Sequence, residues 1–136
     1  MRTFLVIIFI SLTSLAEAAP LRITITEGVV EPLPYAAPAF IGETGASNDL
    51  AIKITELIKS DLLSTGLFRE VPKSSYISGI DNFTSPVQYS DWKAINVQAL
   101  LTGSVLVSGE KLSVKFRVFD VFSNNELGKG LQFNST

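Results

Sequence analysis

The feature that most constrains the fold of this chain is a strict alternation of apolar and polar residues in its C-terminal third. Residues Lys111 to Val121 read KLSVKFRVFDV, which places Leu112, Val114, Phe116 and Val118 on one side of an extended chain. A period of two residues is typical of a β-strand with one buried face. The segment therefore predicts a strand, and with it a sheet that needs neighbouring strands.

Both neighbours of this strand are predicted from the adjacent sequence. The apolar stretch Leu100–Val107 precedes it across the turn residues Ser108-Gly109-Glu110, and Glu126–Phe133 follows after a second turn. Gly103 inside the first stretch marks a bulge or a close backbone approach. The aromatic side chains of this region are expected in the core rather than on a ligand-binding surface: Phe116, Phe119, Phe122 and Phe133.

Helical spacing of apolar residues appears earlier in the chain. Leu50, Ile54, Leu57, Ile58 and Leu62 fall on one face of a helix over 49–64, for which Ser47-Asn48-Asp49 supplies N-cap chemistry and Gly66 the terminating glycine. A short strand over 67–71 and a long connection over 73–86 follow. A second, shorter helix capped by Ser90 then precedes the β-rich region. The order predicts a single α/β domain over 19–136, with a mixed sheet of about five strands and two helices packed on it.

The segment before the long helix reads as extended. Leu21 to Thr26 alternates apolar and polar residues and predicts a strand that ends at Glu27-Gly28 and is pinned in the sheet. Between Val29 and Pro38 three prolines exclude a helix and allow only extended or edge structure.

The first eighteen residues have the order of a secretory signal peptide. Arg2 supplies the positive start, and the apolar run Phe4–Leu15 follows. Ala16 and Ala18 stand at the −3 and −1 positions of a cleavage site, so Ala19 is the expected mature N-terminus. The alternative is an uncleaved membrane anchor, but the run is shorter than the roughly 20 apolar residues that a spanning helix needs. We therefore expect an exported chain, with no stable membrane insertion after cleavage.

The composition argues against several classes of function. The net charge is −2 and does not change when the first eighteen residues are removed, because they carry one charge of each sign. Without a basic excess the chain is not expected to bind nucleic acid. It contains neither histidine nor cysteine. Histidine is the commonest general base, cysteine is a common nucleophile, and both are common metal ligands. We therefore expect no enzymatic activity, no catalytic residues, no cofactor and no metal.

The segment that follows the cleavage site is the candidate binding site. An N-terminal strand with a single charge before Glu27, tethered by a proline-rich stretch, can add to the exposed sheet edge of a partner. The candidate partner-binding residues are Leu21, Arg22, Ile23, Thr24, Ile25, Thr26, Glu27 and Gly28.

The order of these features resembles the N-terminal domain of the TolB family, which belongs to the bacterial Tol–Pal system. The resemblance rests on LRITITEG at 21–28, PAF at 38–40, STGLF at 64–68, DWKAINVQALLTGSV at 91–105 and FRVFD at 116–120. It extends over essentially the whole mature chain.

This resemblance implies a periplasmic adaptor that bridges the inner-membrane protein TolA and the lipoprotein Pal and supports outer-membrane integrity and cell division. It places the TolA contact at 21–28, with Ile23 and Ile25 as apolar anchors. Family members continue into a β-propeller that binds Pal, so the present chain is expected to be truncated before any propeller, and Pal binding is expected only if the parent gene encodes one. Two other classes remain open, a secreted small-ligand-binding domain and a secreted hydrolase.

Overall fold

The computed structural model describes residues 21–135, so the predicted signal peptide and its cleavage residues Ala16, Ala18 and Ala19 lie outside the described part. The main sheet has six strands: β3 (Leu33–Ala36), β4 (Ile41–Gly42), β5 (Phe68–Glu70), β6 (Ala99–Ser108), β7 (Lys111–Asp120) and β8 (Asn125–Ser135). The strand order is β5-β3-β6-β7-β8, with β4 paired to β6. The strands β3, β4, β5 and β6 pair in parallel, whereas β6, β7 and β8 form an antiparallel meander. The mixed α/β fold predicted from the sequence is therefore confirmed.

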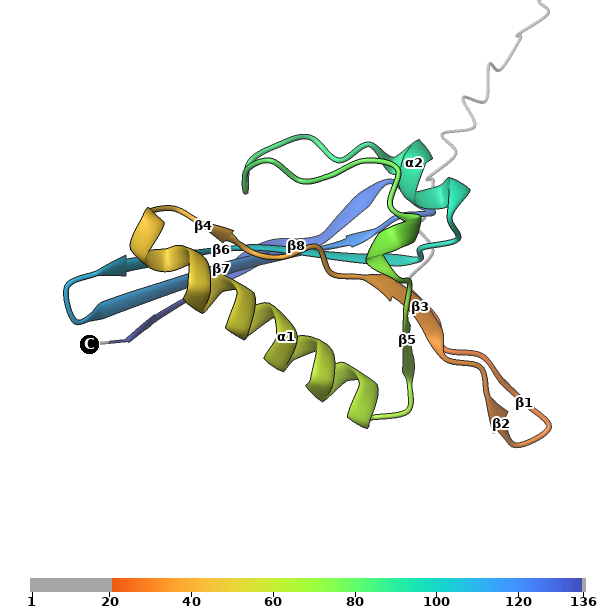
Figure 1. Ribbon diagram of the computed structural model, residues 1–136. Helices are drawn as coiled ribbons and strands as arrows, with labels where there is room; N and C mark the ends of the chain where they lie inside the picture. The colour runs from red at the N-terminus through yellow and green to blue at the C-terminus, as the bar shows by residue number, and fades with distance from the viewer. Residues whose placement is uncertain (1–20, 136) are drawn as a thin grey trace, which may run out of the picture.

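Two helices lie on opposite faces of this sheet (Figure 1). The helix α1 (Asn48–Ser64) matches the predicted helix to within one residue, and Gly66 follows it with φ +70° as the terminating glycine. The short helix α2 (Tyr89–Ala94) lies on the other face together with the long connection and a 3₁₀ turn, η2 (Lys73–Ser75). In the part of the chain that the structure describes, no helix combines the length and apolarity needed to cross a membrane.

The core has a layer on each side of the sheet. On the α2 side, Trp92, Leu100 and Val121 are almost completely buried. On the α1 side, Phe40 packs against Gly103 so closely that a Cβ atom there would overlap its ring. The close backbone approach predicted at Gly103 is therefore confirmed, and its cause is the aromatic ring beneath α1.

The start of α1 differs from its sequence prediction. A 3₁₀ turn, η1 (Gly45–Ser47), leads directly into the helix, and the Ser47 side chain does not cap it. Its hydroxyl instead accepts a hydrogen bond from the Val107 N–H (2.9 Å) and pairs with the Thr44 hydroxyl (2.7 Å). Ser47 thus ties α1 to β6, a contact across 60 residues of sequence. The second helix also begins two residues earlier than predicted, so Gln88 rather than Ser90 precedes it.

The proline-rich segment is extended, as predicted, and its strand β3 is internal rather than at an edge of the sheet. This strand contains Pro34 yet lies inside the sheet between β5 and β6, with all four residues buried. The Pro34 carbonyl accepts a hydrogen bond from Gln98 (2.9 Å), and the β3–β6 pairing begins at the next residue, Tyr35. The proline therefore stands where the ladder starts, and its missing N–H leaves no ladder position empty.

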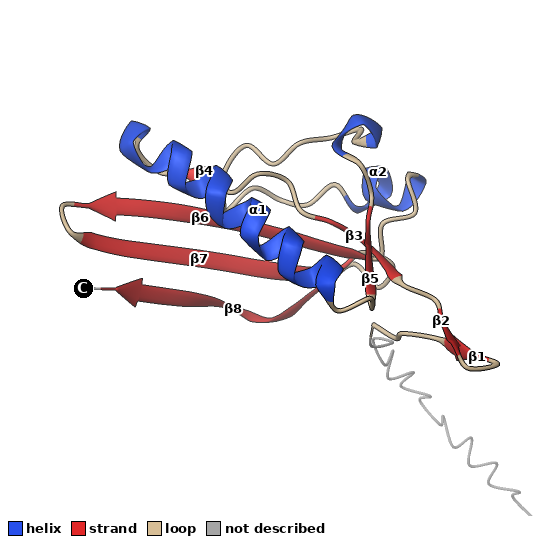
Figure 2. Cartoon of the chain, turned by 60° about the horizontal axis from the view of Figure 1, so that its bottom comes forward, coloured by secondary structure: helices blue, strands red, loops and turns tan. Residues whose placement is uncertain are grey.

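Four phenylalanines of the C-terminal region were expected in the core, and this prediction is wrong for two of them. Phe119 is buried and Phe116 is half-buried, but Phe122 is 50% exposed and Phe133 is 59% exposed. Phe133 lies on β8, beyond the part of the sheet that α1 crosses (Figure 2). An alternating pattern assigns a residue to a face but does not show whether another layer covers that face.

Candidate partner-binding hairpin

The candidate binding residues form a small hairpin outside the main sheet. The two-residue strands β1 (Ile25–Thr26) and β2 (Val29–Val30) pair antiparallel as a separate two-stranded sheet. Ile25 lies opposite Val30 and Thr26 opposite Val29. The hairpin projects from the end of the molecule near β3 and β5 (Figures 1 and 2).

The expected strand over 21–26, pinned in the sheet, is therefore not what the structure shows. Only Ile25 and Thr26 are in a strand, and their partner is the segment that follows the turn. The physical reason lies in Glu27 and Gly28, which have φ values of +53° and +79°. Positive φ at both central residues is the geometry of the tight turn that favours two-residue hairpins.

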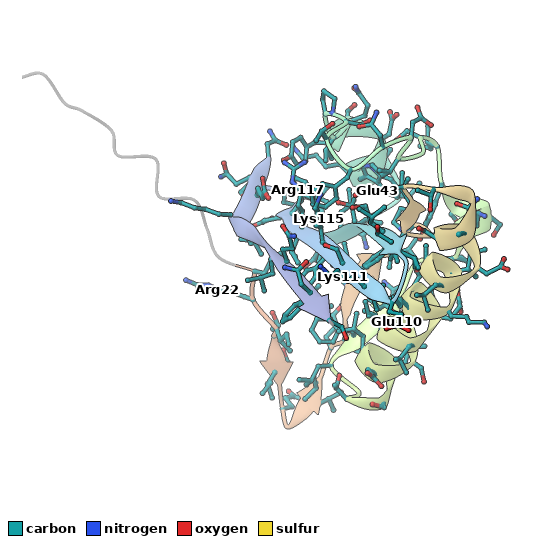
Figure 3. The ribbon with its side chains drawn as sticks, turned by 90° about the vertical axis from the view of Figure 1, so that its left-hand side faces the viewer. Arg22, Glu43, Glu110, Lys111, Lys115 and Arg117 are labelled. Atoms are coloured by element: carbon teal, nitrogen blue, oxygen red, sulfur yellow. The ribbon has the colours of Figure 1, made fainter. Side chains whose placement is uncertain are left out.

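The apolar side chains of the hairpin are the most exposed part of the site. Ile25 is 66% exposed, Val29 is 69% exposed and Ile23 is 36% exposed. Arg22, the single charged residue before Glu27, extends away from the body of the molecule (Figure 3). By contrast, Leu21 is half-buried against the cluster that contains Leu33 and Tyr35 and thereby attaches the hairpin to the core.

The backbone of the hairpin has an open edge at Ile25. The Glu31 N–H donates to the Thr24 carbonyl at 3.1 Å, so Thr24 and Glu31 form a hydrogen-bonded pair. Because hydrogen-bonded and non-hydrogen-bonded pairs alternate along an antiparallel ladder, the N–H and C=O of Ile25 point away from β2. These two groups make no hydrogen bond to β2 and are available to a strand placed beside β1.

Sequence reasoning missed Val29 and Val30 as part of the site. The binding range predicted from the sequence ends at Gly28, because the pair Glu27-Gly28 predicts the end of a strand rather than the centre of a hairpin. The signal that identifies the hairpin is the arrangement of Ile25-Thr26 and Val29-Val30 around a two-residue turn that contains glycine.

Two hollows near the hairpin bear on small-molecule binding. The first, at its base beside Arg22, Glu31 and Gln98, has a volume of about 80 Å³, well below the roughly 300 Å³ of an ordinary ligand pocket. The second, about 460 Å³ between α1 and the sheet, is lined by apolar residues and by Tyr35, and burial raises the pKa of that phenol to about 12. The first hollow is polar but too small for an ordinary ligand, whereas the second is large enough but lacks the polar groups that orient one. Residues 21–135 contain no cluster of acidic side chains suited to a metal ion.

The chain is similar in sequence to proteins of the Tol–Pal system. The sequence pattern of the family described as TolB amino-terminal domain matches residues 21–127. The Tol-Pal system protein TolB of Roseobacter denitrificans is 55% identical over 120 residues, and that of Cereibacter sphaeroides strain ATCC 17029 is 57% identical over 118 residues. These alignments include 88% and 87% of this chain but only 27% of each relative. The chain thus spans about a quarter of the length of the relatives it matches.

Solved structures show the same fold at low sequence identity. TolB from Acinetobacter baumannii superposes with a TM-score of 0.60 at 20% identity, over 77% of this chain and 23% of that one. The C-terminal domain of LpoB from Escherichia coli superposes with a TM-score of 0.57 at 14% identity, over 82% of this chain and 87% of that one. The similarity to LpoB concerns the fold alone.

Proposed function

Because the chain belongs to the family of TolB amino-terminal domains, we propose that it is a periplasmic adaptor of the Tol–Pal envelope complex. In this proposal the hairpin β1–β2 and the residues leading into it, 21–30, bind a TolA-like inner-membrane protein. That contact supports outer-membrane integrity and cell division. A Pal-like lipoprotein is a further partner only where the parent gene also encodes a propeller.

The observation that carries this proposal is the exposure of Ile25 and Val29 on a hairpin that stands apart from the main sheet. Exposed apolar side chains on a projecting element favour a protein partner, since the hairpin has no core of its own to bury them. The segment 21–30 carries only Arg22 and Glu27, which have opposite charges. Apolar contacts rather than electrostatic attraction would therefore supply most of the affinity.

Strand addition is the mode of binding that the backbone supports. The unpaired groups of Ile25 can hydrogen-bond to an extended segment of the partner, which would extend the two-stranded hairpin to three strands. In this arrangement the main-chain bonds fix the register, and the side chains of Ile23 and Ile25 occupy apolar depressions on the partner. The hairpin does not need to open, because β2 occupies only one edge of β1.

The test is a calorimetric titration of the secreted chain with the C-terminal periplasmic domain of TolA. Replacing the apolar anchor with Ile25→Glu should weaken binding by roughly tenfold or more, as expected for the loss of a central anchor worth 1–2 kcal/mol. The matched control is Ile77→Glu, the same substitution at a similarly exposed isoleucine (60%) of the long connection, outside residues 21–30. Ile25 contacts no core residue, so both variants should unfold at the temperature of the unmodified chain.

Two results would contradict the proposal. The first is the absence of binding by the unmodified chain while its tryptophan emission shows a folded core. The second is an equal loss of affinity in both variants, which would indicate a general charge effect rather than an apolar anchor. The mass of the secreted chain should also be determined beforehand, because cleavage after Ala18 is part of the proposal.

A further inference from the structure

The turn of the hairpin β1–β2 contains a residue that does not suit its backbone conformation. Glu27 and Gly28 are the two central residues of this turn, and both have positive φ. Glycine adopts that region without strain, whereas the Cβ atom of a glutamate comes too close to the following carbonyl oxygen. The residue that such a turn favours before its glycine is asparagine or aspartate, because their short side chains tolerate the left-handed region. Glu27 therefore makes the hairpin less stable than the most favourable turn sequence would.

The other turns of the described chain follow the usual preference. Within residues 21–135, every other residue with positive φ is a glycine or an asparagine. The closest comparison is the turn between β6 and β7, which also has two central residues. There Gly109 has the positive φ (+61°), and Glu110 stands at the next position, where φ is not positive. Glu27 is thus an exception within its own chain, and the requirements of a tight turn do not explain it.

The surroundings of Glu27 are those of the candidate binding site. Its side chain is exposed, and it forms no ion pair with any of residues 21–135. The apolar side chains on either side of the turn, Ile25 and Val29, are 66% and 69% exposed. Backbone strain is characteristic of functional positions, where the side chain has a role that outweighs its local cost. The strain at Glu27 therefore points to a contact that its carboxylate makes when the hairpin is bound.

We propose that the Glu27 carboxylate pairs with a basic side chain of the partner, a lysine or an arginine beside the strand to which β1 adds. This inference rests on the function proposed above and assigns a chemical property to the partner's docking site. Glu27 is the only charged residue of the hairpin over 25–30. A basic group opposite it would determine which end of the partner's strand lies next to the turn, because charge pairs act on orientation and association rate more than on affinity.

The position of Glu27 along the hairpin fits this role. It directly follows Thr26, the last residue of β1, and lies two residues beyond Ile25, whose N–H and C=O point away from β2. Two residues of a strand span about 7 Å. The carboxylate therefore lies just past the end of the pairing with the partner, at the rim of the contact, where water still has access. A charge pair at a rim adds modestly to affinity and makes binding depend on salt.

The experiment is a calorimetric titration of the secreted, mass-verified chain and of Glu27→Gln with the C-terminal periplasmic domain of TolA. Glutamine keeps the size of the side chain and removes its charge. At about 50 mM salt Glu27→Gln should bind about fivefold more weakly, the upper range for an exposed ion pair, and at about 500 mM salt the difference should shrink. The matched control is Glu110→Gln, which removes the same charge from the two-residue turn at the opposite end of the molecule (Figures 1 and 2). It should bind like the unmodified chain.

A second pair of variants separates the charge from the turn. Aspartate and asparagine both fit the left-handed position and have nearly the same size. Glu27→Asp and Glu27→Asn should therefore both show a better-formed hairpin than the unmodified chain in NMR spectra. Glu27→Asp should nevertheless bind the TolA domain more tightly than Glu27→Asn, because only the aspartate carries the charge. A role of this position in the turn alone predicts equal affinities.

Three results would overturn the inference about Glu27. One is equal affinity of Glu27→Gln and the unmodified chain at the lower salt concentration. Another is an equal loss of affinity in Glu110→Gln, which would reflect the net charge of the chain alone. The third is a difference that salt does not change, which would exclude a basic group as the contact. All three leave the proposed function intact as long as the unmodified chain binds and Ile25→Glu weakens that binding, whereas absence of binding by the unmodified chain contradicts the proposed function itself.

Discussion

At the residue scale, Gly103 is tightly restricted by its surroundings. A Cβ atom at this position would overlap the Phe40 ring, which is itself held because the Phe40 N–H donates to the Thr55 hydroxyl at 2.8 Å. Gly103→Ala should therefore lower the free energy of unfolding by about 1–3 kcal/mol, the usual effect of overpacking a core. Urea denaturation followed by the emission of Trp92, the only tryptophan, measures this change. Gly79→Ala is the control, since a Cβ there contacts nothing within 4 Å, and equal stability of the two variants would contradict the explanation.

Arg117 and Glu126 form the ion pair with the most specific geometry in the described residues. The Arg117 Nε and Nη2 atoms donate to the two carboxylate oxygens of Glu126 at 2.9 and 2.8 Å, and Nη1 donates to the Phe83 carbonyl at 3.1 Å. These bonds tie β7 and β8 to the long connection, and the guanidinium also lies over the Phe119 ring at 4.8 Å. The hydrogen bond from Arg117 lowers the pKa of Glu126 below its ordinary value of 4.5.

The sign of the pH dependence follows from this lowered pKa. Stabilisation by the pair is present above the ordinary pKa of the carboxyl group and is lost as the pH falls through the lowered value. Glu126→Gln should therefore lower the free energy of unfolding by about 0.5–1 kcal/mol at about pH 7, and the difference should shrink toward about pH 3. Urea denaturation at the two pH values measures this. A difference that does not change with pH would show that the amide disturbs packing rather than removing a charge.

At the element scale, the hairpin β1–β2 is the least supported part of the fold, because it pairs with no strand of the main sheet. Gly28 has φ +79° and open space around it, so Gly28→Val should act through backbone strain alone, at about 1–2 kcal/mol. We expect the variant to lose the hairpin pairing in NMR spectra and to bind the TolA domain more weakly. Its core should unfold at an unchanged urea concentration. Gly79→Val is the control at a glycine without positive φ, and an intact hairpin in Gly28→Val would contradict the strain argument.

At the scale of the whole molecule, the two sides of the sheet are covered unequally. On one side, α2 and the long connection bury Leu100, Phe119 and Val121. On the other side, α1 crosses β6 and β7, and within residues 21–135 Leu131 and Phe133 of β8 are more than half exposed. Leu131 of β8 is 57% exposed on that side and is no part of the hairpin. Leu131→Lys should therefore leave TolA binding unchanged in the same calorimetric titration.

The sequence by itself determined the elements whose pattern is local. The period of two in β7, the helical spacing and terminating glycine of α1, and the close approach at Gly103 could all be recognised without coordinates. These features depend on backbone geometry and on the division of side chains between two faces, which neighbouring residues specify. The mixed α/β fold class follows from the order of the elements.

Only the tertiary structure decided how these elements are used. The prolines before α1 left open whether the extended segment lies inside a sheet or at its edge, and β3 is internal because its ladder with β6 starts one residue after Pro34. The alternating residues before Glu27 suggested a sheet strand, yet the turn at Glu27-Gly28 folds them into a separate hairpin. The exposure of Leu57 on α1 and the burial of Phe40 beneath that helix depend on packing between segments far apart in the chain. A local pattern assigns a side chain to a face, but the long-range packing determines whether that face is buried, exposed or open to a partner.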